Sequence, residues 1–181
     1  MKAFVGPSIA IFLTLAGCGP APAPWTREDQ AAATTRNYGG VTPSTLRAKA
    51  EQVIRLTDPN AVRFEYTDSG FNATRSIFVY AVITAITGDY QYTVRVGRKG
   101  SGSTIEFKAF SNLGGTTTAA FDNGSSVFWD QKPLYDLFFA RLDYLLGNRD
   151  GWITCKDAPA QLNARAHQME PLCVGARDAT P

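Results

Sequence analysis

Apolar residues between positions 42 and 60 recur with the spacing of a helix. Thr42 is a preferred N-cap residue, and Pro43 is preferred at the first helical position. Four apolar residues then follow at i, i+4, i+7 and i+8 and share one face: Leu46, Ala50, Val53 and Ile54. Because the polar segment 57–60 with its proline ends this pattern, the sequence predicts an amphipathic helix of about four turns.

The pattern then changes to the period of a strand. Apolar and polar residues alternate over 62–67, and Asp68-Ser69-Gly70 is a predicted turn. The nearly continuous apolar run 77–86 predicts one central strand buried on both faces, with a hairpin turn at Gly88-Asp89. Alternation resumes over 90–96 and 105–109, and two short strands are expected over 116–121 and 125–129, joined at 122–124.

A second helix is predicted from Pro133. It has the clearest apolar stripe of the residues after position 18, and Gly147 ends it. The stripe consists of Leu134, Phe138, Leu142, Leu145 and Leu146. The order of elements predicts an α+β fold, a two-layer sandwich in which a helix at each end of the domain packs on one face of an antiparallel meander sheet of about five strands. The tail after it is expected to be irregular, with a short helix over 159–167.

The first eighteen residues have the form of a secretory signal. A basic head precedes the apolar run 3–16, which is too short to span a bilayer as a helix. Leu15-Ala16-Gly17-Cys18 resembles the lipobox of bacterial lipoproteins. The resemblance implies cleavage before Cys18, a lipid on its thiol and, since Gly19 is not aspartate, location in the outer membrane facing the periplasm. An ordinary cleaved signal in which Cys18 is incidental is the alternative.

A proline-rich segment follows Cys18 and predicts an extended tether. We expect it to continue to residue 41, with a loose helical turn over 27–33 and with Trp25 docked either on a partner or on the domain. The expected organisation is therefore a signal peptide at 1–17, a lipid-anchored tether at 18–41, an α+β domain at 42–147 and a C-terminal tail at 148–181.

Cys155 and Cys173 are the remaining cysteines, an even pair in a compartment that oxidises thiols. A disulfide that staples the tail is the main prediction. The alternative is a nucleophilic cysteine activated by His167, which lies between them, although the flanking residues carry no signature of such a site.

Composition narrows the function further. A formal net charge of +2 over 181 residues disfavours nucleic acid as a partner, and a single histidine excludes metal sites that need two imidazoles. The glycines at 97, 100 and 102 lack the spacing of a phosphate loop, and no Gly-x-Ser-x-Gly motif is present. We therefore expect no metal, no cofactor and no catalytic residue.

The domain also resembles small helix-grip lipoproteins of the proteobacterial envelope, such as the accessory lipoproteins of the barrel-assembly machinery. The resemblance covers roughly 42–147 and rests on the first helix, the strand segment 90–96 and the helix segment 134–142. It implies an accessory or assembly role in the envelope and carries over no catalytic residue. Together with the lack of a catalytic motif, this leads us to expect a non-enzymatic protein that acts through a protein partner, in outer-membrane maintenance or in a secretion apparatus, with Trp25 and the sheet edge at 125–129 as candidate contact surfaces. The alternative is a lipoprotein that holds an apolar or cell-wall-related molecule between sheet and helices.

Overall fold

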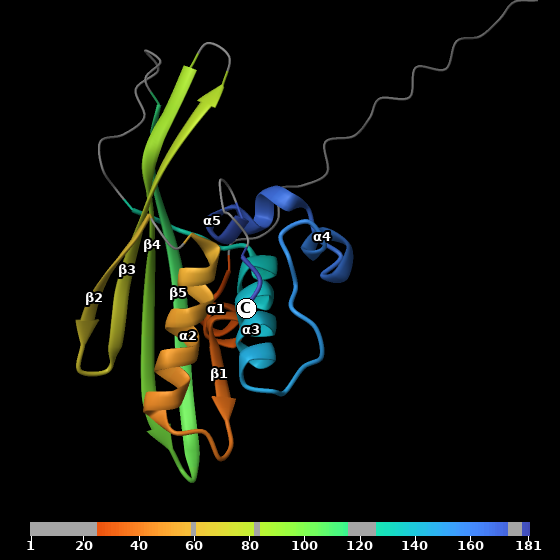
Figure 1. Cartoon of the computed structure of the whole chain (residues 1–181). Coiled ribbons are helices and arrows are strands. Elements are labelled where there is room, and N and C mark those ends of the chain that lie inside the picture. Colours follow the sequence, from red (N-terminus) through yellow and green to blue (C-terminus); the bar gives the residue numbers. More distant parts are fainter. Residues whose placement is uncertain (1–24, 59–60, 82–83, 116–125, 174–178) are drawn as a thin grey trace, which may run out of the picture.

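The computed structural model describes residues 25–58, 61–81, 84–115, 126–173 and 179–181 (Figure 1). Its helices are α1 (Arg27–Thr34), α2 (Pro43–Thr57), α3 (Lys132–Leu145), α4 (Ala158–Gln161), the 3-10 helix η1 (Ala166–Met169) and α5 (Glu170–Cys173). Its strands are β1 (Thr35–Tyr38), β2 (Val62–Thr67), β3 (Gly70–Ala81), β4 (Thr84–Lys99), β5 (Gly102–Gly115) and β6 (Val127–Phe128).

These elements form the α+β sandwich that the sequence predicts. Strands β2 to β5 make a sequential antiparallel meander. The sheet has six strands and departs from a pure meander, because β1 and β6 both pair with β5. Helix α2 lies between β1 and β2 in the chain and therefore crosses from one edge of the sheet to the other.

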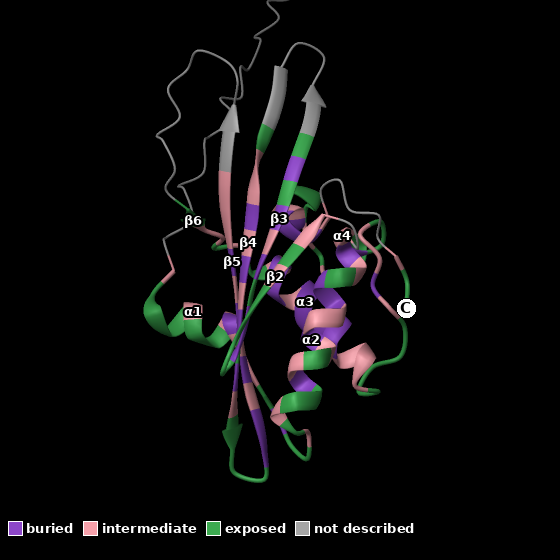
Figure 2. Ribbon diagram, turned by 60° about the vertical axis from the view of Figure 1, so that its left-hand side comes forward, coloured by how far each residue is buried: buried purple, intermediate pink, exposed green. Residues whose placement is uncertain are grey.

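Helices α2 and α3 cover one face of the sheet (Figure 2). Inward-facing side chains alternate along β4, as the period-two pattern requires: Tyr90, Tyr92, Val94 and Val96 are buried. On β5, Phe107 stacks on Phe138 of α3 with ring centroids 3.7 Å apart. Helix α2 begins where predicted, with the Thr42 hydroxyl accepting from the backbone N–H of Thr45 at 3.2 Å.

The predicted strand over 77–86 is wrong. The apolar run belongs to two strands, the end of β3 and the start of β4, which pair with each other through Val79 opposite Ile86 and Ala81 opposite Thr84. The predicted turn at Gly88-Asp89 is wrong for the same reason, since both residues lie inside β4. An uncharged apolar run carries no turn chemistry, so its pattern could not show where the chain reverses.

The N-terminal boundary also differs from the expected one: the helical turn expected over 27–33 is present as α1, but it is followed by β1, and both belong to the domain rather than to a tether. Helix α1 starts with a capping box in which the Thr26 hydroxyl accepts from the N–H of Asp29, whose carboxylate accepts from the N–H of Thr26. Strand β1 then pairs with β5 through Thr35 opposite Glu106. The segment is short and mostly polar, so capping and pairing define it where hydrophobic periodicity does not.

The remaining segments agree with the sequence only in part. The predicted strand over 125–129 contains β6, whereas the predicted strand 116–121 and turn 122–124 lie outside the described residues. The short helix expected over 159–167 is interrupted, because α4 ends at Gln161 and η1 begins at Ala166.

Candidate functional site

The predicted anchor residue, Cys18, lies outside the described residues, and the described chain begins at Trp25. The Trp25 ring packs on the domain itself, with centroids 5.8 Å from Tyr135 of α3 and 6.3 Å from Phe128 of β6. Of the two destinations considered for this side chain, the structure therefore shows the domain. Seven residue steps separate Cys18 from this docked ring.

Strand β1 is fastened to α3 by a polar contact. The Arg36 guanidinium donates to the Asp143 carboxylate at 3.2 Å and lies over the Phe139 ring at 4.5 Å from its centroid. The Tyr38 hydroxyl donates to the same carboxylate at 2.8 Å. Burial, with Asp143 adding to it, raises the pKa of Tyr38 well above its ordinary value. The N-terminal segment is thus a fixed part of the domain.

Cys155 and Cys173 form a disulfide between residues 18 apart in sequence. The buried Arg141 of α3 lies beside this bridge, donating from Nε to the Ile153 carbonyl at 2.9 Å. His167, the proposed partner of a nucleophilic cysteine, is exposed on η1. A disulfide sulfur has no thiolate to act as nucleophile, so the catalytic alternative would require the reduced protein.

The stapled tail lies over a buried arginine on the sheet. Arg75 of β3 is 1% exposed, and its guanidinium donates to the Pro171 carbonyl at 3.2 Å and lies 3.6 Å from the Asp58 carboxylate. The Tyr92 hydroxyl also donates to the Pro171 carbonyl. One more tail carbonyl, that of Gln168, accepts from the Trp129 indole at 2.9 Å. Two buried side chains of the sheet, with the half-buried Trp129 beside it, thus bind the tail through its backbone.

Two tyrosines under the tail have strongly shifted pKa values. Burial raises the pKa of Tyr90 to about 12, and the nearby Glu170 carboxylate adds to the shift. Burial also raises the pKa of Tyr92 well above its ordinary value, although the positive charge of Arg75 opposes the shift. Both hydroxyls are therefore neutral at physiological pH and belong to the packed interior.

The alternation of residues along β3 is the one sequence feature that indicates the buried Arg75 and its partners. Phe71, Ala73 and Ile77 are buried inward-facing residues of β3, and Arg75 occupies the third position of that period-two series, between Ala73 and Ile77. A charged residue at an inward-facing position requires buried partners. The tail that supplies them has no apolar periodicity and could not be identified in advance.

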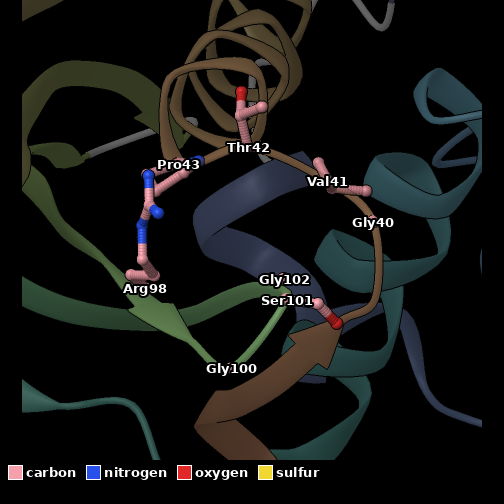
Figure 3. A pocket seen from close by; sticks show the side chains of 8 residues that line it. All are labelled: Gly40, Val41, Thr42, Pro43, Arg98, Gly100, Ser101 and Gly102. Carbon is pink, nitrogen blue, oxygen red and sulfur yellow. The ribbon is translucent and has the colours of Figure 1, made fainter.

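Hollows among the described residues lie on the surface. Figure 3 shows one of about 230 Å³ where the start of α2 meets the β4–β5 turn, with Arg98 as its charged side chain. Another, of about 370 Å³, lies on the uncovered face of the sheet and is lined by Glu65, Asn72, Ala73, Thr74, Gln91, Tyr92 and Thr93. Both are open depressions with polar walls.

Strand β2 leaves one long edge of the sheet open. Among the described strands it pairs only with β3, and its outer residues Glu65, Tyr66 and Thr67 are exposed. The edge expected at 125–129 is much shorter, because β6 has two residues and is itself paired with β5 at Phe110 and Ser111.

The described residues contain no group of three or more His, Cys, Asp or Glu side chains arranged to hold a metal ion. Within the same part of the chain, no helix is both long and apolar enough to cross a bilayer. A scan of protein-family models matches no family, and searches of curated proteins and of solved structures find no match.

Proposed function

We propose that the protein is a lipoprotein of the outer membrane, anchored through Cys18 on the periplasmic side, and that it acts as a non-enzymatic accessory of an envelope assembly through contacts with a protein partner. The observation that carries this proposal is the position of Trp25. Only seven residue steps lead from Cys18 to a ring packed on Phe128 and Tyr135. An acylated Cys18 would hold the domain close to the membrane at a fixed end.

The uncovered face of the sheet is the surface that fits a protein partner best. Helices α2 and α3 occupy the other face, and the open face presents amide, hydroxyl and carboxylate groups around the 370 Å³ hollow. It adjoins the open edge of β2, which offers backbone N–H and C=O groups for strand addition.

The packing between sheet and helices favours this function over an internal ligand site. Phe107 and Phe138 are fully buried and in ring contact at the centre of that interface, and the facing Leu46, Ile54 and Leu142 are fully buried as well. An apolar ligand at this point would have to displace packed side chains, which costs several kcal/mol.

Affinity purification from solubilised envelopes tests the proposal. The acylated protein should recover a stoichiometric envelope partner, and Cys18→Ala should not. Thr93→Arg, on the open face, should lose the partner while keeping the lipid. Ala48→Arg on the exposed side of α2 is the matched control and should keep both. Recovery of no partner by the acylated protein, or equal loss in both arginine variants, would contradict the proposed contact.

A further inference from the structure

An uncharged arm projects from the end of the domain at which Trp25 docks. The arm consists of the paired segments 77–81 of β3 and 84–88 of β4, and β5 accompanies it to Gly115. In Figure 1 these strands extend past α2 and α3. From Ser76 to Gly88 the sequence contains no Asp, Glu, Lys, Arg or His.

The strand register fixes the level of Trp25 relative to this arm. Trp25 packs on Phe128, which pairs with Phe110 of β5. Phe110 lies opposite Gln91 of β4, which in turn lies opposite Thr74 of β3. Thr74 of β3 therefore lies at the level of the docked tryptophan, three residues before the arm begins.

The distance along β3 from the level of Trp25 to the end of the arm matches the reach of the chain that precedes Trp25. Seven residue steps lead from Thr74 to Ala81, which is about 23 Å at the rise of a strand. Seven residue steps also separate Cys18 from Trp25, and a proline-rich chain spans about 22 Å over that number. A lipid on Cys18 and the end of the arm can thus reach the same plane when the arm points along the tether.

Two exposed apolar side chains lie at this end of the sheet. Phe78 is 59% exposed and Val127, level with the base of the arm at Ser111, is 61% exposed. Among the described residues one more large apolar side chain has such exposure, Tyr66 of β2, which donates its hydroxyl to Glu51 of α2. An uncharged strand pair with an exposed phenylalanine would promote aggregation in water, whereas the boundary between lipid headgroups and acyl chains accommodates it.

We infer that this arm, where Ala81 of β3 lies opposite Thr84 of β4, contacts the surface of the same bilayer that holds Cys18, so that lipid anchor and arm together fix the domain's orientation on the membrane. The inference rests on the proposed anchoring. It adds a second, protein-mediated membrane contact whose chemistry is apolar and uncharged, so the contact should resist raised salt concentration. With the arm toward the lipid, the open face of the sheet is left available to a partner.

The test places a fluorophore on the arm. A full-length mature chain with Cys18→Ser and a hexahistidine tag before residue 18 is held on vesicles of phosphatidylethanolamine, phosphatidylglycerol and a nickel-chelating lipid. Phe78→Cys then supplies the one free thiol, because Cys155 and Cys173 are bridged. Asn72→Cys is the matched control, six residues back on the same face of β3 and also exposed.

A lipid-borne quencher should reduce fluorescence at position 78 and leave position 72 unchanged, and aqueous iodide should do the opposite. The difference should persist when the salt concentration is raised. Equal quenching at the two positions would overturn the inference and leave the arm as a surface for a protein. Because the tag replaces the lipid, this outcome is independent of whether Cys18 is acylated, which mass spectrometry of the natural protein decides separately.

Discussion

The disulfide between Cys155 and Cys173 should supply a large share of the domain's stability. Its removal in Cys155→Ala/Cys173→Ala opens a loop of 18 residues in the unfolded chain. The chain-entropy relation assigns about 3 kcal/mol to a loop of that length at 25 °C. This is a sizeable part of the net stability of an ordinary domain, which is about 5–15 kcal/mol.

The contacts of the tail show where the loss should be felt first. Met169 and Leu172 are buried in the core, and the Pro171 carbonyl accepts from Arg75 and Tyr92. These contacts remain in the double variant, but no covalent cross-link then holds the segment after Ile153 to itself. We expect amide exchange in η1 and α5 to speed up more than exchange in β4 and β5.

Urea unfolding of the oxidised wild type and the double variant measures this effect. The free energy of unfolding should fall by about 3 kcal/mol. The wild type in a reducing agent is the matched control and should lose a similar amount. A loss below about 1 kcal/mol in both samples would refute the reasoning, because the tail would then be held by its packing alone.

Three further predictions concern the N-terminal segment and the buried tyrosines. Gly102→Ala should cost about 1–3 kcal/mol and detach β1, since an added Cβ would lie 2.1 Å from the Tyr38 carbonyl oxygen; Gly39→Ala, with open space around it, should be neutral in the same urea titration. Trp25→Ala should cost about 2 kcal/mol through its two aromatic contacts and speed amide exchange in α1. Burial raises the pKa of Tyr90 to about 12, above the unfolded value near 10, so the stabilisation from neutral Tyr90 is complete below about pH 10 and is lost as the pH rises through the folded value. The free energy of unfolding should therefore fall between about pH 10 and pH 12, and the tyrosinate absorbance that Tyr90→Phe removes should appear in the folded protein only near the upper end of this range. Absorbance that Tyr90→Phe removes already near pH 10 in the folded protein would contradict the burial of this ring.

The sequence correctly predicts those helices and strands in which the periodic apolar residues are the residues that are buried in the core. Helix α2 shows this, because its cap at Thr42 and its stripe from Leu46 to Ile54 are both local features. Strand alternation placed the body of β4 and β5 correctly for the same reason. The prediction for 77–86 is wrong because a uniformly apolar run is compatible with one strand or with two. The strand pairing that decides between them depends on the rest of the sheet and not on the run itself.

The candidate surfaces were less accessible from sequence. Residues 27–38 lack a hydrophobic pattern, so the attachment of β1 through Arg36 and Asp143, which are distant in sequence, could not be foreseen. The binding of the Pro171 carbonyl by Arg75 is another contact between distant residues. By contrast, the acylation of Cys18 is predicted from four consecutive residues and stays a prediction, because its position precedes the described chain.

The mass of the N-terminal peptide tests the proposed lipid anchor at Cys18 most directly. Mass spectrometry of the N-terminal peptide of the membrane-extracted protein should show a chain that begins at Cys18 and carries a diacylglyceryl group on its sulfur. In Cys18→Ala that mass should be absent and the protein should leave the outer-membrane fraction. A mature chain that begins elsewhere, or an unmodified Cys18 in a protein still held in the membrane, would contradict the proposed anchoring.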